Sequence, residues 1–197
     1  PRGGGQKTKA ALSGQEGLYT LLLRGKENGR EKSEKRIISC VSRCLNPYSE
    51  YDAFLACAEN PRLRFLISNT TEAGIVYDPA CRFEDRPAQS FPGKLTQLLY
   101  RRFQVFGKEK GKGFILLPCE LIPDNGKSLE KCVTAYARQW RLGEDFQKWL
   151  REENIFCSTL VDRIVTGYPE KEAAGLCRQQ GYEDEAMVAA ETFASWV

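Results

Sequence analysis

Histidine is absent from this 197-residue chain, and methionine occurs once, at Met187. Without histidine, no mechanism within the chain can use an imidazole as a general base or as a metal ligand. The eight cysteines include no C-x-x-C pair, and the closest two are Cys40 and Cys44. We therefore expect no metal site.

Long apolar runs are missing as well. No stretch approaches the roughly 20 residues that a helix needs to span a bilayer, and no signal peptide opens the chain, so a cytoplasmic protein with no membrane partner is expected. Several cysteines lie inside apolar helix or strand patterns, which favours small, reduced core residues. These are Cys40, Cys57, Cys119, Cys132 and Cys177.

Charge of one sign does not dominate. The 29 basic and 26 acidic residues leave a net charge of +3 and are mostly interspersed, and the densest basic stretch, residues 108–112, has the glycines of a solvated loop. No nucleic-acid-binding motif accompanies this charge, so no nucleic-acid partner is expected. With 42% hydrophobic and 28% charged residues, the composition is that of an ordinary globular protein.

Strand and helix patterns alternate along most of the chain. Residues 1–17 look mobile, and two apolar runs, 18–24 and 36–41, predict a hairpin. Further strands are predicted at 63–67, 113–119 and 160–165, the second of them as a near-continuous apolar run buried on both faces of a parallel sheet. Helices are predicted from residue 51 after the N-cap Ser49, along 95–106, from 129 after the N-cap Ser128, from 146, and at 170–179 before Gly181. This alternation predicts an α/β protein with a doubly wound, mostly parallel sheet and flanking helices.

Polar side chains follow three of these strands at their carboxyl ends, where α/β proteins bind ligands. Ser68, Asn69 and Thr70 follow the first strand. The spacing of Asn69 and Glu72 also fits a capping box, so the cluster could equally begin a helical turn. Asn125 is either part of a plain Asn-Gly turn or an amide that holds a substrate oxygen. Asp162 belongs either to a structural ion pair or a strand end in solvent, or to a polar pocket at the ligand edge of the sheet.

Contiguous strings in the sequence resemble the mannitol dehydrogenase family of metal-independent polyol and sugar-acid dehydrogenases. The strings are residues 48–51, 64–75, 117–122 and 156–169, and the resemblance runs from about Gly14 to the last residue. Mannitol-type members usually carry Cys-Asp-Asn where this chain has Cys119-Glu120-Leu121, and a shorter Asp-Arg-Ile-Thr-Pro where this chain has residues 162–169. Those departures favour the uronate branch of the family.

The resemblance implies NAD-dependent hydride transfer that reduces D-tagaturonate, a small sugar acid, to D-altronate. Ser68, Asn69 and Thr70 would then border the nicotinamide, while Asn125 and Asp162 would face the substrate. A related hexuronate or hexitol substrate, such as fructuronate or mannitol, remains an alternative. So does a non-catalytic α/β binding module whose polar clusters are only caps and turns.

The resemblance also implies missing parts. The family's first strand, its glycine-rich turn and the helix after it are not in the chain, and neither is the helical carboxyl-terminal domain that supplies a catalytic lysine. We therefore expect a partial Rossmann-like fold, with residues 18–197 as a truncated dinucleotide-binding domain. No catalytic residue is expected in this chain, the carboxyl-terminal domain is its expected partner, and the chain by itself is expected to be inactive.

Overall fold

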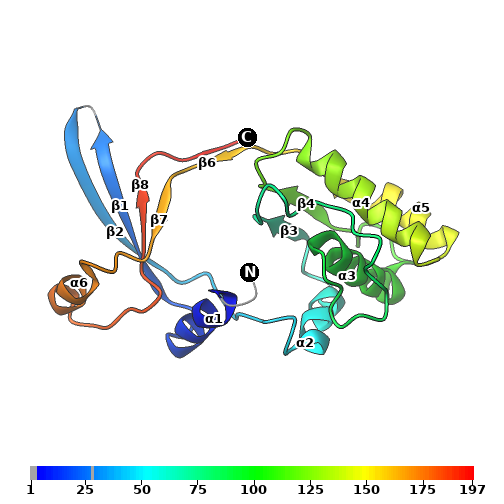
Figure 1. Ribbon diagram of the computed structural model, residues 1–197, viewed down its shortest axis with the longest axis horizontal. Coiled ribbons are helices and arrows are strands. Elements are labelled where there is room, and N and C mark those ends of the chain that lie inside the picture. Colours follow the sequence, from blue (N-terminus) through cyan, green and yellow to red (C-terminus); the bar gives the residue numbers. More distant parts are fainter. Residues whose placement is uncertain (1–3, 28) are drawn as a thin grey trace. The chain divides into compact units, whose positions relative to one another are not determined.

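The computed structural model describes residues 4–27 and 29–197 (Figure 1). The chain forms two compact units, which are described separately. The first unit contains the residues up to Asn46 together with Asp162–Ser195, and the second contains Pro47–Val161 and Trp196–Val197. Within the described residues, no helix is long and apolar enough to cross a membrane.

The second unit contains a three-stranded parallel sheet in the order β3-β4-β5. Its strands are β3 (Phe65–Ser68), β4 (Ile115–Pro118) and β5 (Ile155–Phe156). Helix α3 (Phe91–Phe106) connects β3 to β4, and helices α4 (Asn125–Gln139) and α5 (Glu144–Glu153) connect β4 to β5 (Figure 1). The short helix α2 (Tyr51–Ala56) and the 3-10 turn η1 (Cys57–Glu59) precede β3. The prediction of parallel strands joined by helical crossovers is confirmed.

Apolar side chains at helical spacing form the core of this unit. The predicted stripes on α3 and α4 are buried, as are the apolar residues of α5, and all of them pack around Leu116 of β4. The buried stripe residues are Leu95, Leu99, Leu129, Val133, Phe146 and Trp149. Burial of these side chains is the main free-energy term that holds the helices on the sheet.

Only one face of this parallel sheet is covered by those helices. Leu116 is 1% exposed, whereas Phe65 is 53% and Ile67 is 60% exposed, because alternate side chains of a strand point to opposite faces. In β4 itself, Ile115 and Leu117 on that face are half-buried, so the prediction that residues 113–119 form a strand buried on both faces is wrong for one face. An apolar run indicates that both faces of a strand are covered. It does not show whether residues of this chain cover both of them.

The first unit contains a four-stranded sheet in the order β2-β1-β8-β7. Strands β1 (Tyr19–Glu27) and β2 (Arg30–Ile38) form the predicted hairpin, with Tyr19 opposite Ile38. Strand β8 (Val188–Glu191) pairs parallel to β1 and antiparallel to β7 (Val165–Gly167). Helix α6 (Ala173–Gln180) ends at Gly181, whose φ of +81° gives the left-handed cap that was predicted.

The amino-terminal segment differs from its prediction. Residues 1–17 were expected to be mobile, but helix α1 covers Gly4–Gly14. The Gln15 side chain donates to Asp184 Oδ1 at 2.9 Å and accepts from the Glu185 N–H at 2.7 Å. Both partners lie more than 160 residues away in the sequence, so a local pattern could not reveal them.

The predicted strand at 160–165 is divided in two. Val161–Asp162 forms β6, which pairs with β9 (Ser195–Trp196), and Val165 begins β7. Between them, the Glu191 side chain accepts from the Ile164 N–H at 2.5 Å, and the Glu191 N–H donates to the Ile164 carbonyl. A side chain thus takes the place of one rung of the strand ladder.

Two helix starts and one cysteine also differ from their predictions. Helix α2 has Glu50 as its N-cap, where Ser49 was predicted. Helix α4 begins after Asp124, so Ser128 lies inside the helix. Cys40, expected in the core, is exposed, whereas Cys177 is buried.

Tyr136 on α4 gives the second unit an expected pH dependence. Its buried hydroxyl donates to the Asp78 carbonyl at 3.1 Å and accepts from the Asp78 N–H at 2.8 Å. Burial raises the pKa of Tyr136 from its ordinary value of 10 to about 12. The unfolded chain therefore loses this proton at lower pH than the folded chain, and the stabilisation, present in full below pH 10, is lost as pH rises through 12.

We expect the free energy of unfolding to fall by about 2 kcal/mol over that window because of this one group. Urea unfolding at pH 9, 10 and 11 should therefore show a steeper decline for the native protein than for Tyr136→Phe. Tyr77→Phe, which removes a more exposed hydroxyl nearby, serves as the control and should keep the native slope. Parallel slopes for the native protein and Tyr136→Phe would contradict the assignment.

Candidate functional site

The strand-end site is the set of residues that directly follow or close the three parallel strands of the second unit: 68–70, 119–120 and 157–159. The strands run in register, with Ser68 beside Pro118. The ladder continues past β3 and β4, because the Cys119 N–H donates to the Ser68 carbonyl at 2.7 Å. Parallel strands end at one edge of a sheet, which brings three segments from distant parts of the sequence together.

Glu120 links the first two of these segments. Its carboxylate is buried, with 2% of the residue exposed. One oxygen, Oε2, accepts from the Ser68 hydroxyl at 3.0 Å. The other, Oε1, accepts from the Thr70 N–H at 3.0 Å and from the Thr70 hydroxyl at 2.8 Å. These three hydrogen bonds offset the cost of burying a carboxylate and hold the Ser68–Thr70 segment against the end of β4.

Asn69 lies between these two anchored residues and is exposed. The alternative prediction of a capped helical turn is wrong, because residues 69–71 are not helical and the Gly74 N–H closes a tight turn onto the Thr71 carbonyl at 2.7 Å. A Cβ atom at Gly74 would collide with the Thr70 hydroxyl. The glycine therefore allows the turn to pass close to Thr70 while that hydroxyl contacts Glu120.

Asn125 links the second and third segments. The residue is 1% exposed, and its Nδ2 donates to the carbonyls of Pro118, Glu120 and Thr159 at 2.8–3.0 Å. Its Oδ1 accepts from the N–H groups of Gly126 and Thr159. An amide has two donor hydrogens and two acceptor lone pairs, so two of the three carbonyls share one hydrogen and all of the amide's capacity is used within the chain.

That geometry bears on both alternatives predicted for Asn125. It is the first residue of helix α4 and not part of a free turn. A side chain whose four hydrogen-bonding positions are occupied by main-chain groups has none left for a substrate oxygen, so its role in this structure is to hold β4 and the segment after β5 together. Gly126 is needed beside it, because a Cβ there would collide with the Cys157 carbonyl.

Asp162, the other residue predicted to face the substrate, lies on β6 in the first unit and is exposed. Its neighbour Arg163 donates through Nε and Nη2 to the Glu191 carbonyl at 3.2 and 3.0 Å. The Arg163 guanidinium is thus held by a main-chain carbonyl.

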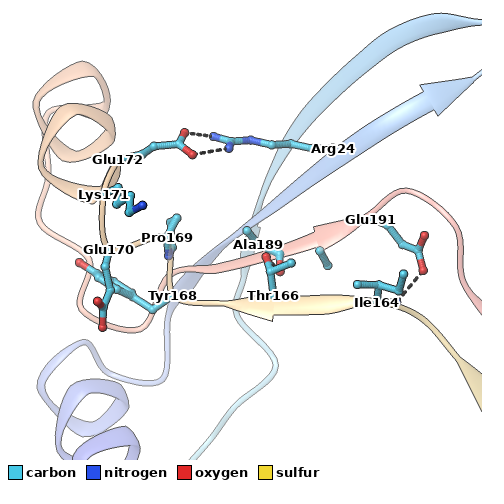
Figure 2. Close-up of a pocket in the computed structure, with 11 residues that line it drawn as sticks. Arg24, Ile164, Thr166, Tyr168, Pro169, Glu170, Lys171, Glu172, Ala189 and Glu191 are labelled. Atoms are coloured by element: carbon cyan, nitrogen blue, oxygen red, sulfur yellow. Dashed lines mark hydrogen bonds and ion pairs between the residues drawn. The ribbon is translucent and has the colours of Figure 1, made fainter.

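An open hollow of about 710 Å³ lies in the first unit, beside β7, β8 and the start of α6 (Figure 2). Figure 2 shows the side chains of Arg24 and Glu172 facing each other, joined by hydrogen bonds of 3.0 and 2.8 Å. The hydrogen bond from Arg24 lowers the pKa of Glu172. Because these two charges neutralise each other, the pair offers no net charge to a ligand.

Sequence reasoning missed Glu120 as a site residue, although it lies directly after a predicted strand. The available signal was a carboxylate that follows a buried strand and faces hydroxyls at the end of the neighbouring strand. That signal becomes usable only when β3 and β4 are known to be adjacent and parallel.

A parallel sheet with helical crossovers and polar segments at its carboxyl edge defines an α/β protein of the Rossmann type. In comparisons with known proteins, the family described as "Mannitol dehydrogenase Rossmann domain" matches residues 5–197. The chain therefore belongs to the mannitol dehydrogenase family.

Curated relatives include altronate oxidoreductases. The protein from Phocaeicola vulgatus is 48% identical over 186 residues, which are 94% of this chain and 39% of that protein. The Shigella flexneri protein is 52% identical over 184 residues, 93% of this chain and 38% of its own length. This chain thus spans about two-fifths of the length of these relatives.

Solved structures support the fold. Pseudomonas fluorescens mannitol 2-dehydrogenase, in a ternary complex with NAD and D-mannitol, aligns with a TM-score of 0.80 at 22% identity, covering 99% of this chain and 40% of that one. A D-sorbitol dehydrogenase in substrate-free form aligns with a TM-score of 0.78 at 22% identity, covering 98% of this chain and 40% of that one.

Proposed function

We propose that this chain is the dinucleotide-binding part of an NAD-dependent reductase that converts D-tagaturonate to D-altronate, a tagaturonate reductase or altronate oxidoreductase. The observation that carries the proposal is the identity of 48–52% to altronate oxidoreductases over 93–94% of the chain. The match is far closer than the 22% identity to the mannitol and sorbitol dehydrogenases of known structure.

The strand-end site fits a nicotinamide cofactor. Ser68, Asn69 and Thr70 lie at the carboxyl edge of the parallel sheet, where dinucleotides bind in this class of fold. Asn69 and Thr70 are exposed and Ser68 is half-buried, so a ligand can reach all three. When bound, the nicotinamide supplies a hydride for the reduction of a carbonyl. The three residues would hold and orient that ring, and none of them needs to move a proton.

On the substrate side, we propose Asp162 as the residue that this chain contributes. An exposed carboxylate can accept a hydrogen bond from a sugar hydroxyl and so fix the position of the reacting carbonyl. We retain Asn125 only in an indirect role, through the three strand ends that it contacts. The family resemblance places the lysine that donates the proton outside this chain, so we expect residues 1–197 alone to show no turnover.

We further propose that the remaining part of the protein covers an apolar surface of the second unit. An open hollow of about 570 Å³ lies beside the starts of α4 and the segment after β5. Several apolar side chains on its rim are well exposed: Leu121 is 63%, Leu160 is 54% and Val197 is 81% exposed. Exposed apolar groups of this size are typical of surfaces that a neighbouring domain covers.

The proposed activity is tested by mixing the whole protein with NADH and one ketose or keto-acid at a time and following NADH oxidation. We expect D-tagaturonate to be the best substrate, and D-fructuronate and D-fructose to be poorer by kcat/KM. A preference for fructuronate or fructose would assign the protein to a different branch of the family. No oxidation with any of the three would overturn the reductase proposal.

A non-catalytic binding module is the competing explanation, and Asp162 separates the two. Because Asp162 is exposed, Asp162→Asn should leave the thermal unfolding temperature unchanged while lowering kcat/KM for the keto-acid by about tenfold or more in the whole protein. Glu152→Gln, an exposed change on α5, is the matched control. Equal kcat/KM for both variants would show that Asp162 does not contribute to substrate binding.

A further inference from the structure

We propose that Glu120 is a positioning residue that sets the hydrogen-bonding polarity of Ser68 and Thr70. Both hydroxyls then present acceptor oxygens to a ligand, and they favour a ligand that carries N–H donors. The proposal rests on the function proposed above and deepens it, since the carboxamide of a nicotinamide dinucleotide offers such a donor. It assigns a role to a buried carboxylate that touches neither cofactor nor substrate.

The argument begins with the chemistry of the three groups. An ionised carboxylate only accepts hydrogen bonds, and a hydroxyl has a single proton to donate. Both Ser68 and Thr70 give that proton to Glu120, over 3.0 and 2.8 Å. The Thr70 hydroxyl also lies 3.4 Å from the Thr71 carbonyl, but the shorter contact to a charged acceptor is the stronger one. Each hydroxyl is therefore left with lone pairs alone for any further partner.

The position of the two hydroxyls makes this polarity relevant to a ligand. Glu120 is 2% exposed, so it meets no solvent or ligand itself. Ser68, the last residue of β3, is half-buried, and Thr70, two residues further on, is exposed. A ligand at this edge meets oxygens that can only accept, and it must supply hydrogen atoms or leave those oxygens unpaired.

Replacement of Glu120 by glutamine would reverse this polarity at one identified atom. The Thr70 main-chain N–H is an obligatory donor to the Oε1 position, so the glutamine must place its carbonyl oxygen there. The NH₂ group then occupies the Oε2 position, which faces the Ser68 hydroxyl. Ser68 must accept from that NH₂, and its own proton turns toward the ligand. The size of the side chain is unchanged.

The experiment compares two reduced dinucleotides bound to the whole protein. NADH carries the carboxamide NH₂, whereas reduced 3-acetylpyridine adenine dinucleotide has a methyl group in its place. We expect the native protein to favour NADH and Glu120→Gln to bind NADH about tenfold more weakly, with unchanged Kd for the acetyl analogue, as loss of one hydrogen bond predicts. Fluorescence titration gives both values of Kd.

Ser68→Ala keeps the proposal testable if the Glu120 variant folds poorly. It removes the hydroxyl without disturbing a main-chain hydrogen bond, and it should by itself reduce the preference for NADH over the acetyl analogue. In the double variant, Glu120→Gln should add little to the effect of Ser68→Ala, because the two changes act on one atom. Glu152→Gln on the surface of α5 should keep the native ratio of the two Kd values.

Several outcomes would overturn the inference. A native ratio of Kd values in Glu120→Gln or in Ser68→Ala would show that the polarity of Ser68 is not read by the ligand. Equal losses for NADH and the analogue would indicate a structural role only. If Glu120→Gln binds NADH as tightly as the native protein and keeps the native preference for NADH over the acetyl analogue, the inference fails while the proposed function stands. If neither dinucleotide binds the whole protein, both fail.

Discussion

Replacement of Arg102 by leucine is expected to destabilise the protein by at least about 3 kcal/mol, because it would leave several buried carbonyls without a partner. The Arg102 residue is fully buried on α3, with 0% exposed. Its guanidinium donates to four main-chain carbonyls at 2.6–3.1 Å. Those acceptors are Lys112, Ala58, Asn60 and Leu63.

The guanidinium is suited to this place by its shape. It lies 4.5 Å from the ring centre of Phe106 and 4.8 Å from that of Phe114, so its planar group packs against aromatic rings while its edge donates. Burial lowers the pKa of Arg102, as expected for a charge removed from water. Its four carbonyl partners lie in the segments before β3 and before β4, so the side chain positions both strands against α3.

Urea unfolding of Arg102→Leu, Arg102→Lys and Arg101→Leu measures the effect. Lysine restores a charge but not the planar fork, so Arg102→Lys should also be destabilised, by about 2 kcal/mol. Arg101 is the matched control, because it is the adjacent arginine and makes an exposed ion pair with Glu59 at 2.6 Å. Its loss should cost less than about 1 kcal/mol. Similar midpoints for the two leucine variants would contradict the role assigned to Arg102.

Asn125→Asp should be as damaging as Asn125→Ala, with a loss of about 3 kcal/mol or more in each case. Alanine removes the side chain that pairs the Thr159 N–H and leaves the carbonyls of Glu120 and Thr159 without this donor. Aspartate keeps the shape, but it replaces the NH₂ group with an oxygen that faces three carbonyl oxygens. Repulsion between these oxygens should cancel the stabilisation from the remaining side-chain oxygen, which still accepts from the N–H groups of Gly126 and Thr159.

Asn69 provides the control for this pair, because it is an exposed asparagine at the same edge of the sheet. Asn69→Asp and Asn69→Ala should each change the free energy of unfolding by less than about 0.5 kcal/mol. Thermal and urea unfolding of the four variants gives the comparison. An Asn125→Asp variant as stable as Asn69→Asp would show that the amide donor at residue 125 is not needed.

The stability of the Asn125 variants also decides how their activity should be interpreted. Loss of turnover in Asn125→Ala would follow from displacement of the strand ends and would not by itself demonstrate a contact with substrate. Asp162 and Ser68 are better probes, because Asp162 is exposed and the Ser68 hydroxyl is held by a single side-chain partner. Effects on binding at those positions can be measured in a folded protein.

Local patterns predicted the elements that are long and strongly periodic. The stripes on α3, α4 and α5, the strands β3 and β4, the hairpin β1–β2 and the glycine cap of α6 were all predicted close to their observed places. Strands β5 and β8 were missed. Strand β8 is as long as β3 and β4, but β3 and β4 lie within the longer apolar runs 63–67 and 113–119, whereas β5 and β8 have no such run and are defined by their neighbours in the sheet.

The sequence by itself determined the class of fold and predicted the segment Ser68–Thr70 as a ligand edge, because hydrophobic periodicity and strand-end polar residues are local properties. Only the tertiary structure decided which polar groups are free to bind a ligand. The Asn125 side chain, which the sequence predicted to face the substrate, is occupied by main-chain partners, while Glu120 accepts hydrogen bonds from two hydroxyls that lie 50 and 52 residues away in the sequence. Hydrogen-bond saturation depends on which groups meet in space, and the order of residues along the chain does not contain that information until the strands are paired.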